Sequence, residues 1–245
     1  MPKRTLSIRT ADGTCPAGFF APAGEASGAA VILYMDAFGP RPAMDEMAGR
    51  LARQGHAVLV PDLFYRFGDY GAFDAKTAFS DLEKGAQLRK MIGETTQAMT
   101  IADTGAFLEA LAAEGFSGKV GVTGYCMGGA RALNAAASYP DRIAAAASFH
   151  GGNLASDADD SPHRAAGRIK AGVYVGVAGV DKSFPPEQSA RLAQALREAE
   201  VDHTIENYVG MEHGWAVPDH RVYDERGAER HWKRLTTLFD ETLRQ

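Results

Sequence analysis

A cysteine lies between two glycines in the segment Gly124-Tyr125-Cys126-Met127-Gly128, where an apolar strand pattern changes to a helical one. The spacing Gly-x-nucleophile-x-Gly between a strand and a helix is typical of a nucleophile elbow, a sharp turn that exposes the central side chain. A thiol attacks a carbonyl carbon as the thiolate, and the start of a helix favours negative charge. The segment therefore predicts Cys126 as a nucleophile, against the alternative of a cysteine that only packs.

An acid and a histidine follow two later predicted strands. Asp181 comes after the apolar run at 172–179, and His213 comes after the run at 203–209. Together with Cys126 they occur in the order nucleophile, acid, histidine, which is the order of α/β-hydrolases. We expect His213 to form a thiolate–imidazolium pair with the cysteine, and Asp181 to accept a hydrogen bond from the other ring nitrogen.

A tetrahedral intermediate also needs two N–H donors for its oxyanion. Met127 follows the nucleophile, and Ala37 lies in the loop after the run at 30–35, so their N–H groups are predicted as the oxyanion hole. Side chains that flank strand ends are candidates for substrate binding: Phe38, Tyr65, Tyr125, His150 and Trp215. For His150 a turn position with hydrogen bonds to the backbone is an equal alternative, and aromatic residues here can be ordinary packing. No site role is expected for His56, His163, His203, His220 and His231.

The elements that must position these groups can be read from the apolar pattern. A hairpin is predicted at 5–10 and 17–21, and buried strands at 30–35, 56–63, 119–125, 143–150, 172–179 and 203–209. Helices are expected from Pro42 to Gly55 and at 94–114, 127–138 and 186–199. A final amphipathic helix would hold Tyr223, Trp232, Leu235, Leu238, Phe239 and Leu243. The Gly-rich, aromatic stretch 63–85 is predicted to be a long loop with a short helix, lying over the site.

This alternation predicts an α/β fold: one single-domain α/β-hydrolase spanning residues 1–245. Its mostly parallel, doubly wound sheet would be flanked by helices and begin with an N-terminal antiparallel hairpin. The carboxyl ends of the parallel strands are then the expected place for a ligand. A chain of 245 residues, 45% of them hydrophobic, can form one full core.

Composition excludes several other classes. A formal net charge of -5 without a long basic run argues against nucleic-acid binding. The N-terminus has no apolar segment typical of a signal peptide, and no run of about eighteen apolar residues predicts a membrane span.

The two cysteines, Cys15 and Cys126, are expected to be reduced in the cytoplasm. No metal or phosphate-loop motif is found, so no metal and no cofactor are expected. A monomer or a small homo-oligomer is expected.

Three segments resemble the dienelactone hydrolase family, a branch of the α/β-hydrolases with cysteine at the elbow. They are Gly124-Tyr125-Cys126-Met127-Gly128-Gly129, Pro61-Asp62-Leu63-Phe64-Tyr65 and His213-Gly214-Trp215. The resemblance implies an acid after the third strand that holds the resting thiol, and the matching residue here is Asp36, where the family has glutamate. It also places Val217 where family members that act on dienelactone have an arginine for its carboxylate. Arg221, Arg66 and Arg89 are possible replacements.

The leading hypothesis is hydrolysis of a small carboxylic ester or lactone, such as an enol lactone, through a thioester on Cys126. A thiolate is itself a good leaving group, so it suits substrates whose alcohol departs easily. Two alternatives remain open: a redox-active thiol oxidised by peroxide, and a binding protein on a hydrolase fold without activity.

Overall fold

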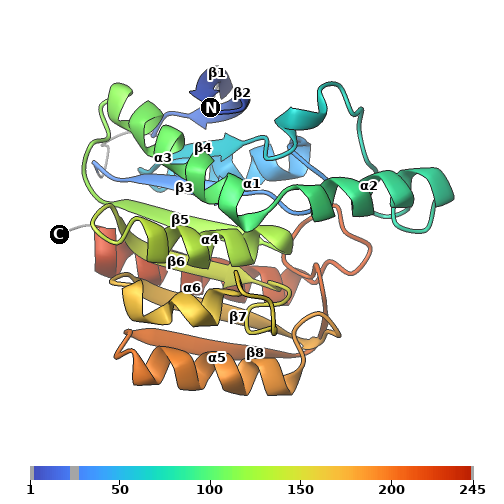
Figure 1. Ribbon diagram of the computed structural model, residues 1–245, viewed down its shortest axis with the longest axis vertical. Coiled ribbons are helices and arrows are strands. Elements are labelled where there is room, and N and C mark those ends of the chain that lie inside the picture. The colour runs from blue at the N-terminus through green and yellow to red at the C-terminus, as the bar shows by residue number, and fades with distance from the viewer. Residues whose placement is uncertain (1–2, 23–27, 244–245) are drawn as a thin grey trace.

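Eight strands form one twisted sheet in the computed structural model, which describes residues 3–22 and 28–243 (Figure 1). The strand order is β1-β2-β4-β3-β5-β6-β7-β8, and the strands from β4 to β8 in this order are parallel. The antiparallel hairpin of β1 and β2 extends this sheet at the β4 edge. The strand bounds are β1 Lys3–Thr10, β2 Gly13–Phe20, β3 Ala30–Tyr34, β4 Ala57–Pro61, β5 Val120–Tyr125, β6 Ile143–Phe149, β7 Gly172–Val180 and β8 His203–Glu212.

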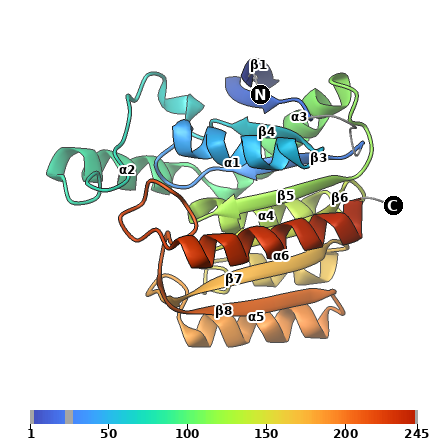
Figure 2. The same ribbon diagram turned by 180° about the vertical axis from the view of Figure 1, so that it is seen from behind.

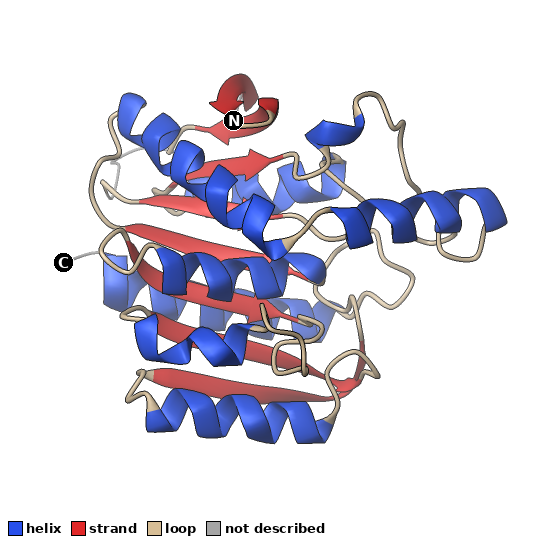
Figure 3. Ribbon diagram, in the orientation of Figure 1, coloured by secondary structure: helices blue, strands red, loops and turns tan. Residues whose placement is uncertain are grey.

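Helices cover both faces of this sheet, which gives three layers (Figure 3). Helices α3, α4 and α5 lie on one face, and α1 and α6 lie on the other (Figures 1 and 2). The helix bounds are α1 Pro42–Arg53, α2 Leu82–Glu94, α3 Gln97–Ala113, α4 Met127–Ser138, α5 Pro186–Glu198 and α6 Glu225–Leu243, with short 3₁₀ helices η1 Tyr65–Phe67 and η2 Pro162–Arg168. Among the helices described, none is both long and apolar enough to cross a membrane.

The apolar runs of the sequence become the centre of the sheet. Every residue of β3, β4 and β5 is buried, because helices cover these strands on both sides. Helix α4 follows β5 directly and is buried over most of its length, since it packs on β5 and β6 with α3 and η2 beside it. The α/β fold with a parallel sheet, flanking helices and an N-terminal hairpin is therefore confirmed.

The region before α3 differs from its prediction. The structure has a 13-residue helix, α2, at Leu82–Glu94, where a loop was expected up to residue 85 and no element was assigned to residues 86–93. Only Gly85, Leu88 and Met91 of α2 are buried, so its apolar period is weak. Helix α2 extends beyond the carboxyl ends of the strands (Figures 1 and 2). Consequently the segment over the site is partly helical.

The end of β8 and the start of α6 also differ slightly from their predictions. Strand β8 continues to Glu212, three residues further than predicted, and carries the chain almost to His213. Tyr223 precedes α6, which begins at Glu225, and is 38% exposed instead of facing the core.

Candidate active site

The turn between β5 and α4 has the geometry of a nucleophile elbow. Cys126 has φ 55° and ψ −119°, a strained conformation for a residue with a side chain, and it is only partly buried. Glycines make the turn possible. A Cβ on Gly124 would lie 1.9 Å from the carbonyl oxygen of Gly128, and a Cβ on Gly128 would lie 2.5 Å from that of Tyr34. The glycines therefore allow α4 to start directly against the ends of β5 and β3.

His150 supports this turn from the neighbouring strand end. Its Nδ1 accepts a hydrogen bond from the Cys126 N–H at 3.2 Å, and the ring is buried. Burial, followed by the charges of His213 and His220, lowers the pKa of His150 well below its ordinary value. A neutral ring with Nδ1 as acceptor is thus the form that holds the backbone of Cys126. This agrees with the predicted alternative of a histidine bonded to backbone.

Asp181 and His213 meet beside the elbow. Nδ1 of His213 lies 2.6 Å from Oδ2 of Asp181, whose side chain is 4% exposed. The Ser183 hydroxyl donates to the other oxygen of Asp181 at 2.7 Å, and its backbone N–H donates to the same oxygen at 2.8 Å. These contacts fix the carboxylate, and the carboxylate in turn orients the imidazole.

The imidazole is electrostatically coupled to the thiol. Burial lowers the pKa of His213, but the charge on Cys126 and hydrogen bonds with Asp181 and Cys126 outweigh burial and raise this pKa to about 10. Burial also raises the pKa of Asp181, yet its bonds to His213 and Ser183 lower it overall. At neutral pH the geometry therefore favours an imidazolium between a carboxylate and the sulfur.

The oxyanion hole was predicted to consist of the N–H groups of Ala37 and Met127. The N–H of Phe38 donates to the Asp36 carboxylate at 3.0 Å. In contrast, the N–H of Ala37 has no acceptor among residues 3–22 and 28–243. The N–H of Met127 belongs to the first turn of α4, where no intrahelical acceptor exists. Both residues line the same cavity as Cys126.

A cavity of about 710 Å³ opens over Cys126 and His213. Its wall includes the apolar side chains of Phe38, Phe79 and Ile92 and three cations that form no ion pair within the described part of the chain: Lys76, Lys182 and Arg221. The cavity is thus suited to a small, partly apolar ligand with negative charge. No group of three or more metal-ligating side chains occurs in the described residues.

Four of the five predicted substrate-binding residues, Tyr65, Tyr125, His150 and Trp215, are not in this cavity wall. The Tyr65 hydroxyl bonds Thr10 and Asp103 near the opening hairpin. The Tyr125 hydroxyl lies 2.8 Å from Nε2 of His231, a buried residue of α6. Trp215 is fully buried and packs on Tyr208 and His150. Phe38 does line the cavity.

Asp36 is placed differently from the contact with the thiol that the family resemblance implied. Arg41 donates two hydrogen bonds to its carboxylate, at 2.7 and 2.8 Å, and Nε2 of His220 lies 2.9 Å from it. Arg41 also bonds Asp219. Burial raises the pKa of Asp36, but the bonds from His220 and Arg41 lower it far below the ordinary range. The carboxylate is thus the buried centre of a charge network under the cavity.

Several members of the site were not predicted from the sequence. Ser183 could have been found from the Asp-x-Ser spacing, which is common where a carboxylate caps a turn. His220, for which no role was expected, lines the cavity and bonds Asp36. No local signal indicates His220. It lies 184 residues after Asp36 in the sequence, and only the fold brings the two side chains together.

The charge network leads to a prediction about stability. Asp36→Asn is expected to lower the free energy of unfolding by about 3 kcal/mol, because it leaves Arg41 buried with less compensation. Since folding lowers the pKa of Asp36, its contribution is present above the ordinary value of 3.8 and is lost as pH falls below it. Urea unfolding at neutral and acidic pH measures both effects.

Asp219→Asn is the matched control for this stability prediction. Asp219 bonds the same Arg41, but its side chain is 37% exposed. We expect its loss to cost less than about 1 kcal/mol. Equal effects of the two substitutions would show that burial of Asp36 does not decide its contribution.

The sheet order, the elbow and the residues at the strand ends define an α/β-hydrolase. The chain belongs to the dienelactone hydrolase family, whose family model matches residues 16–243.

Relatives support this assignment over most of the chain. A carboxymethylenebutenolidase of Rhodococcus opacus is 28% identical over 89% of this chain and 82% of its own length. A solved dienelactone hydrolase-like promiscuous phosphotriesterase from metagenomic libraries is 27% identical and has a TM-score of 0.76. The match covers 99% of this chain and 99% of the solved chain. A solved Klebsiella pneumoniae protein shares the fold with a TM-score of 0.84 at 23% identity, over 97% of this chain and 98% of its own. The chain is therefore a hydrolase similar to carboxymethylenebutenolidase.

Proposed function

We propose that the chain hydrolyses small carboxylic esters or lactones through a thioester on Cys126. The observation that carries this proposal is the contact of His213 with Asp181 at 2.6 Å, together with the charge of Cys126 raising the pKa of His213. A paired imidazolium and sulfur at an elbow constitute an activated thiol nucleophile.

The reaction follows from these positions in two steps. The Cys126 sulfur attacks the carbonyl carbon, and the N–H groups of Met127 and Ala37 stabilise the oxyanion. The carbon–oxygen bond to the alcohol then breaks, and His213 gives its proton to the leaving oxygen. In the second step His213 takes a proton from water, which attacks the thioester and releases the acid and the thiolate. This role is supported by the cavity that Ala37, Cys126 and Met127 line together.

The cavity favours a substrate with an anionic group. Lys76, Lys182 and Arg221 line it without carboxylate partners in the described residues. Val217, at the position of the family's arginine, is fully buried. Arg221, four residues further along the chain, lines the cavity and is a candidate to bind the anionic group in its place. Arg66 is bound to Asp12 and Asp103 instead. Dienelactones, which carry a carboxylate and an enol leaving group, are thus suitable substrates, as the name of the Rhodococcus relative suggests.

The redox alternative has less support. The other cysteine, Cys15, is fully buried in β2, and burial raises the pKa of its thiol to about 12. A thiol held protonated in this way is a poor partner for a disulfide with an oxidised Cys126. A silent binding protein would not need the aligned Asp181–His213 pair.

The test is the initial rate of hydrolysis of p-nitrophenyl acetate and of cis- and trans-dienelactone by the wild-type chain. We expect release of the acid from at least the activated ester, well above the uncatalysed rate. No turnover of any of the three, with intact folding, would overturn the proposal. Loss of the thiol to peroxide under the same conditions would favour the redox alternative.

The ion pair leads to a prediction about His213. In Cys126→Ser the pKa of His213 is expected to fall by at least about one unit, because the sulfur's charge no longer stabilises the imidazolium. NMR titration of labelled histidine measures this shift. Cys15→Ser is the matched control and should leave the pKa of His213 unchanged. An unaltered pKa in Cys126→Ser would contradict the pairing.

A further inference from the structure

A second cavity, of about 330 Å³, adjoins the catalytic one. The two share the wall residues Ile92, Met127, Gly152 and Asn153, so the smaller cavity is a side extension of the site. Its other walls come from the start of α3, from α4 and from the loop before η2. We refer to it below as the side cavity.

The side cavity contains an unusual arginine. Arg131 lies on α4, is 6% exposed and lines the side cavity. Its Nη2 donates to the carbonyl oxygen of Thr95, but its Nε is buried without a hydrogen-bond partner. No carboxylate within residues 3–22 and 28–243 forms an ion pair with it. A buried cation without a counter-ion is costly to maintain.

Two other largely buried arginines, Arg41 and Arg66, have the carboxylate partners that Arg131 lacks. Arg41 is 9% exposed and Arg66 is 15% exposed at the side chain, and each pairs with two carboxylates. Arg131 is more buried than either and has none. Burial accordingly lowers the pKa of Arg131 to about 10, against the opposing charge of Asp160. The guanidinium remains charged at neutral pH, with hydrogen-bonding capacity unused.

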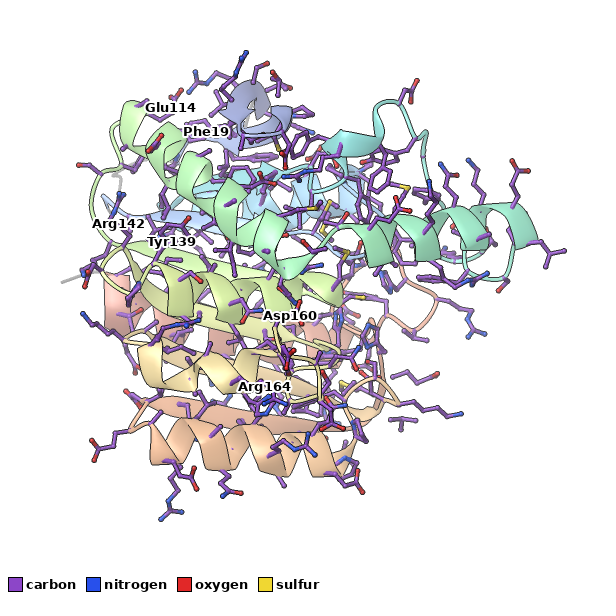
Figure 4. The ribbon with its side chains drawn as sticks, viewed as in Figure 1. Phe19, Glu114, Tyr139, Arg142, Asp160 and Arg164 are labelled. Atoms are coloured by element: carbon purple, nitrogen blue, oxygen red, sulfur yellow. The ribbon has the colours of Figure 1, made fainter. Side chains whose placement is uncertain are left out.

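The rest of the wall suits an oxyanion. Its polar residues are mainly uncharged: Thr95, Thr96, Gln97, Asn153, Ser156 and Ser161. The 17-residue helix α3 begins in this wall, and its Thr96 side chain caps only the N–H of Met99, at 3.2 Å. The one acid of the wall is Asp160, which is exposed and lies in the loop before η2, on the same side of the sheet as α4 (Figure 4). Asp160 makes no ion pair with Arg131 in the described chain.

We propose that the side cavity binds a carboxylate carried by the substrate, with the guanidinium of Arg131 as its counter-ion. This inference rests on the proposed function. Arg131 follows Cys126 by five residues, which is about 7 to 8 Å along α4. The carboxylate would thus lie several bonds from the reacting carbonyl, as in a half-ester of a dicarboxylic acid. Fork-shaped donors such as guanidinium fit this group.

The test compares two chromogenic esters of similar length, mono-p-nitrophenyl glutarate and p-nitrophenyl pentanoate. The measured quantity is the ratio of their KM values. Wild type is expected to favour the charged ester, and Arg131→Met is expected to reduce this preference by about tenfold or more. Arg131→Lys should restore part of it, and Arg168→Met, a change at an exposed arginine, should keep the wild-type ratio. An unchanged ratio in Arg131→Met would overturn the proposal.

A binding measurement separates this proposal from the proposed function. Cys126→Ala cannot form a thioester, yet mono-p-nitrophenyl glutarate should still raise its melting temperature, and p-nitrophenyl pentanoate should do so less. The double variant with Arg131→Gln should lose this difference. If free glutarate and inorganic phosphate bind at Arg131 but the charged ester has no advantage, the site serves a separate anion and the substrate assignment fails. If Arg131 variants only lower the melting temperature, the arginine is structural and the proposal fails.

Discussion

Replacing Cys126 by alanine is expected to lower kcat/KM for p-nitrophenyl acetate by at least about a thousandfold. Alanine keeps the backbone of the elbow and the N–H donors of Met127 and Ala37 but removes the attacking atom. The remaining rate would come from water near His213. Initial rates for the variant and wild type, compared at equal concentrations of folded protein, measure the effect.

Cys126→Ser is the informative companion. Its hydroxyl fits the elbow, but it does not carry the charge that raises the pKa of His213. We expect slower hydrolysis of an enol lactone than in wild type, because the resting ion pair is lost. Hydrolysis as fast as wild type would show that the thiol has no special role. Full activity in Cys126→Ala would place the nucleophile elsewhere.

The second large effect concerns the backbone of the elbow. Gly124→Ala is expected to lower the free energy of unfolding by about 4 kcal/mol or more, or to prevent folding. The added Cβ would lie 1.9 Å from the carbonyl oxygen of Gly128 and 2.8 Å from the nitrogen of Gly129. Neither is the end of a flexible side chain, so β5 and α4 would have to separate. Urea unfolding of the purified variant measures the loss.

Gly118→Ala provides the control for this prediction. A Cβ at Gly118 would meet nothing within 4 Å, and the residue lies in the exposed turn before β5. Its substitution should change the free energy of unfolding by no more than about 0.5 kcal/mol. A Gly124→Ala protein as stable as the Gly118→Ala protein would mean that the elbow can relax, and the steric account would be wrong.

The strands could be predicted because burial on both faces leaves continuous apolar runs in the sequence. Strand β3 at Ala30–Tyr34 and strand β5 at Val120–Tyr125 are such runs, and the helix after β5 begins where expected. Helix α2 could not be predicted in this way, because it extends from the body and buries little. Its N-cap was a usable signal, since the Asp81 side chain accepts from the N–H of Lys84 at 2.8 Å.

The candidate site was predictable where chain order and strand ends determine position. Cys126, Asp181 and His213 follow strands whose carboxyl ends share one edge of the sheet, so their proximity follows from the topology. The direction in which each side chain points was harder to predict, because successive side chains of a strand face opposite sides of the sheet. Tyr125 precedes Cys126 and therefore points away from the cavity, toward His231.

Partners from distant loops were not predictable at all. The sequence places Arg41 five residues after Asp36, but Asp219 and His220 join the network only through the fold. The resemblance to the family thus gave the position of an acid under the cavity, whereas the side-chain contacts decided what that acid binds. Here the acid is Asp36, and its carboxylate binds the Arg41 guanidinium and lies 2.9 Å from Nε2 of His220.

The proposed hydrolysis requires a thioester on Cys126 as its intermediate. The most direct measurement is mass spectrometry of wild-type protein quenched during turnover of p-nitrophenyl acetate, followed by digestion to locate the acetyl group. We expect one acetyl group on the peptide that contains Cys126, removable by hydroxylamine and absent from Cys126→Ala. Acetyl on another residue, or turnover without any acyl-enzyme under quench conditions that preserve a thioester, would contradict the account.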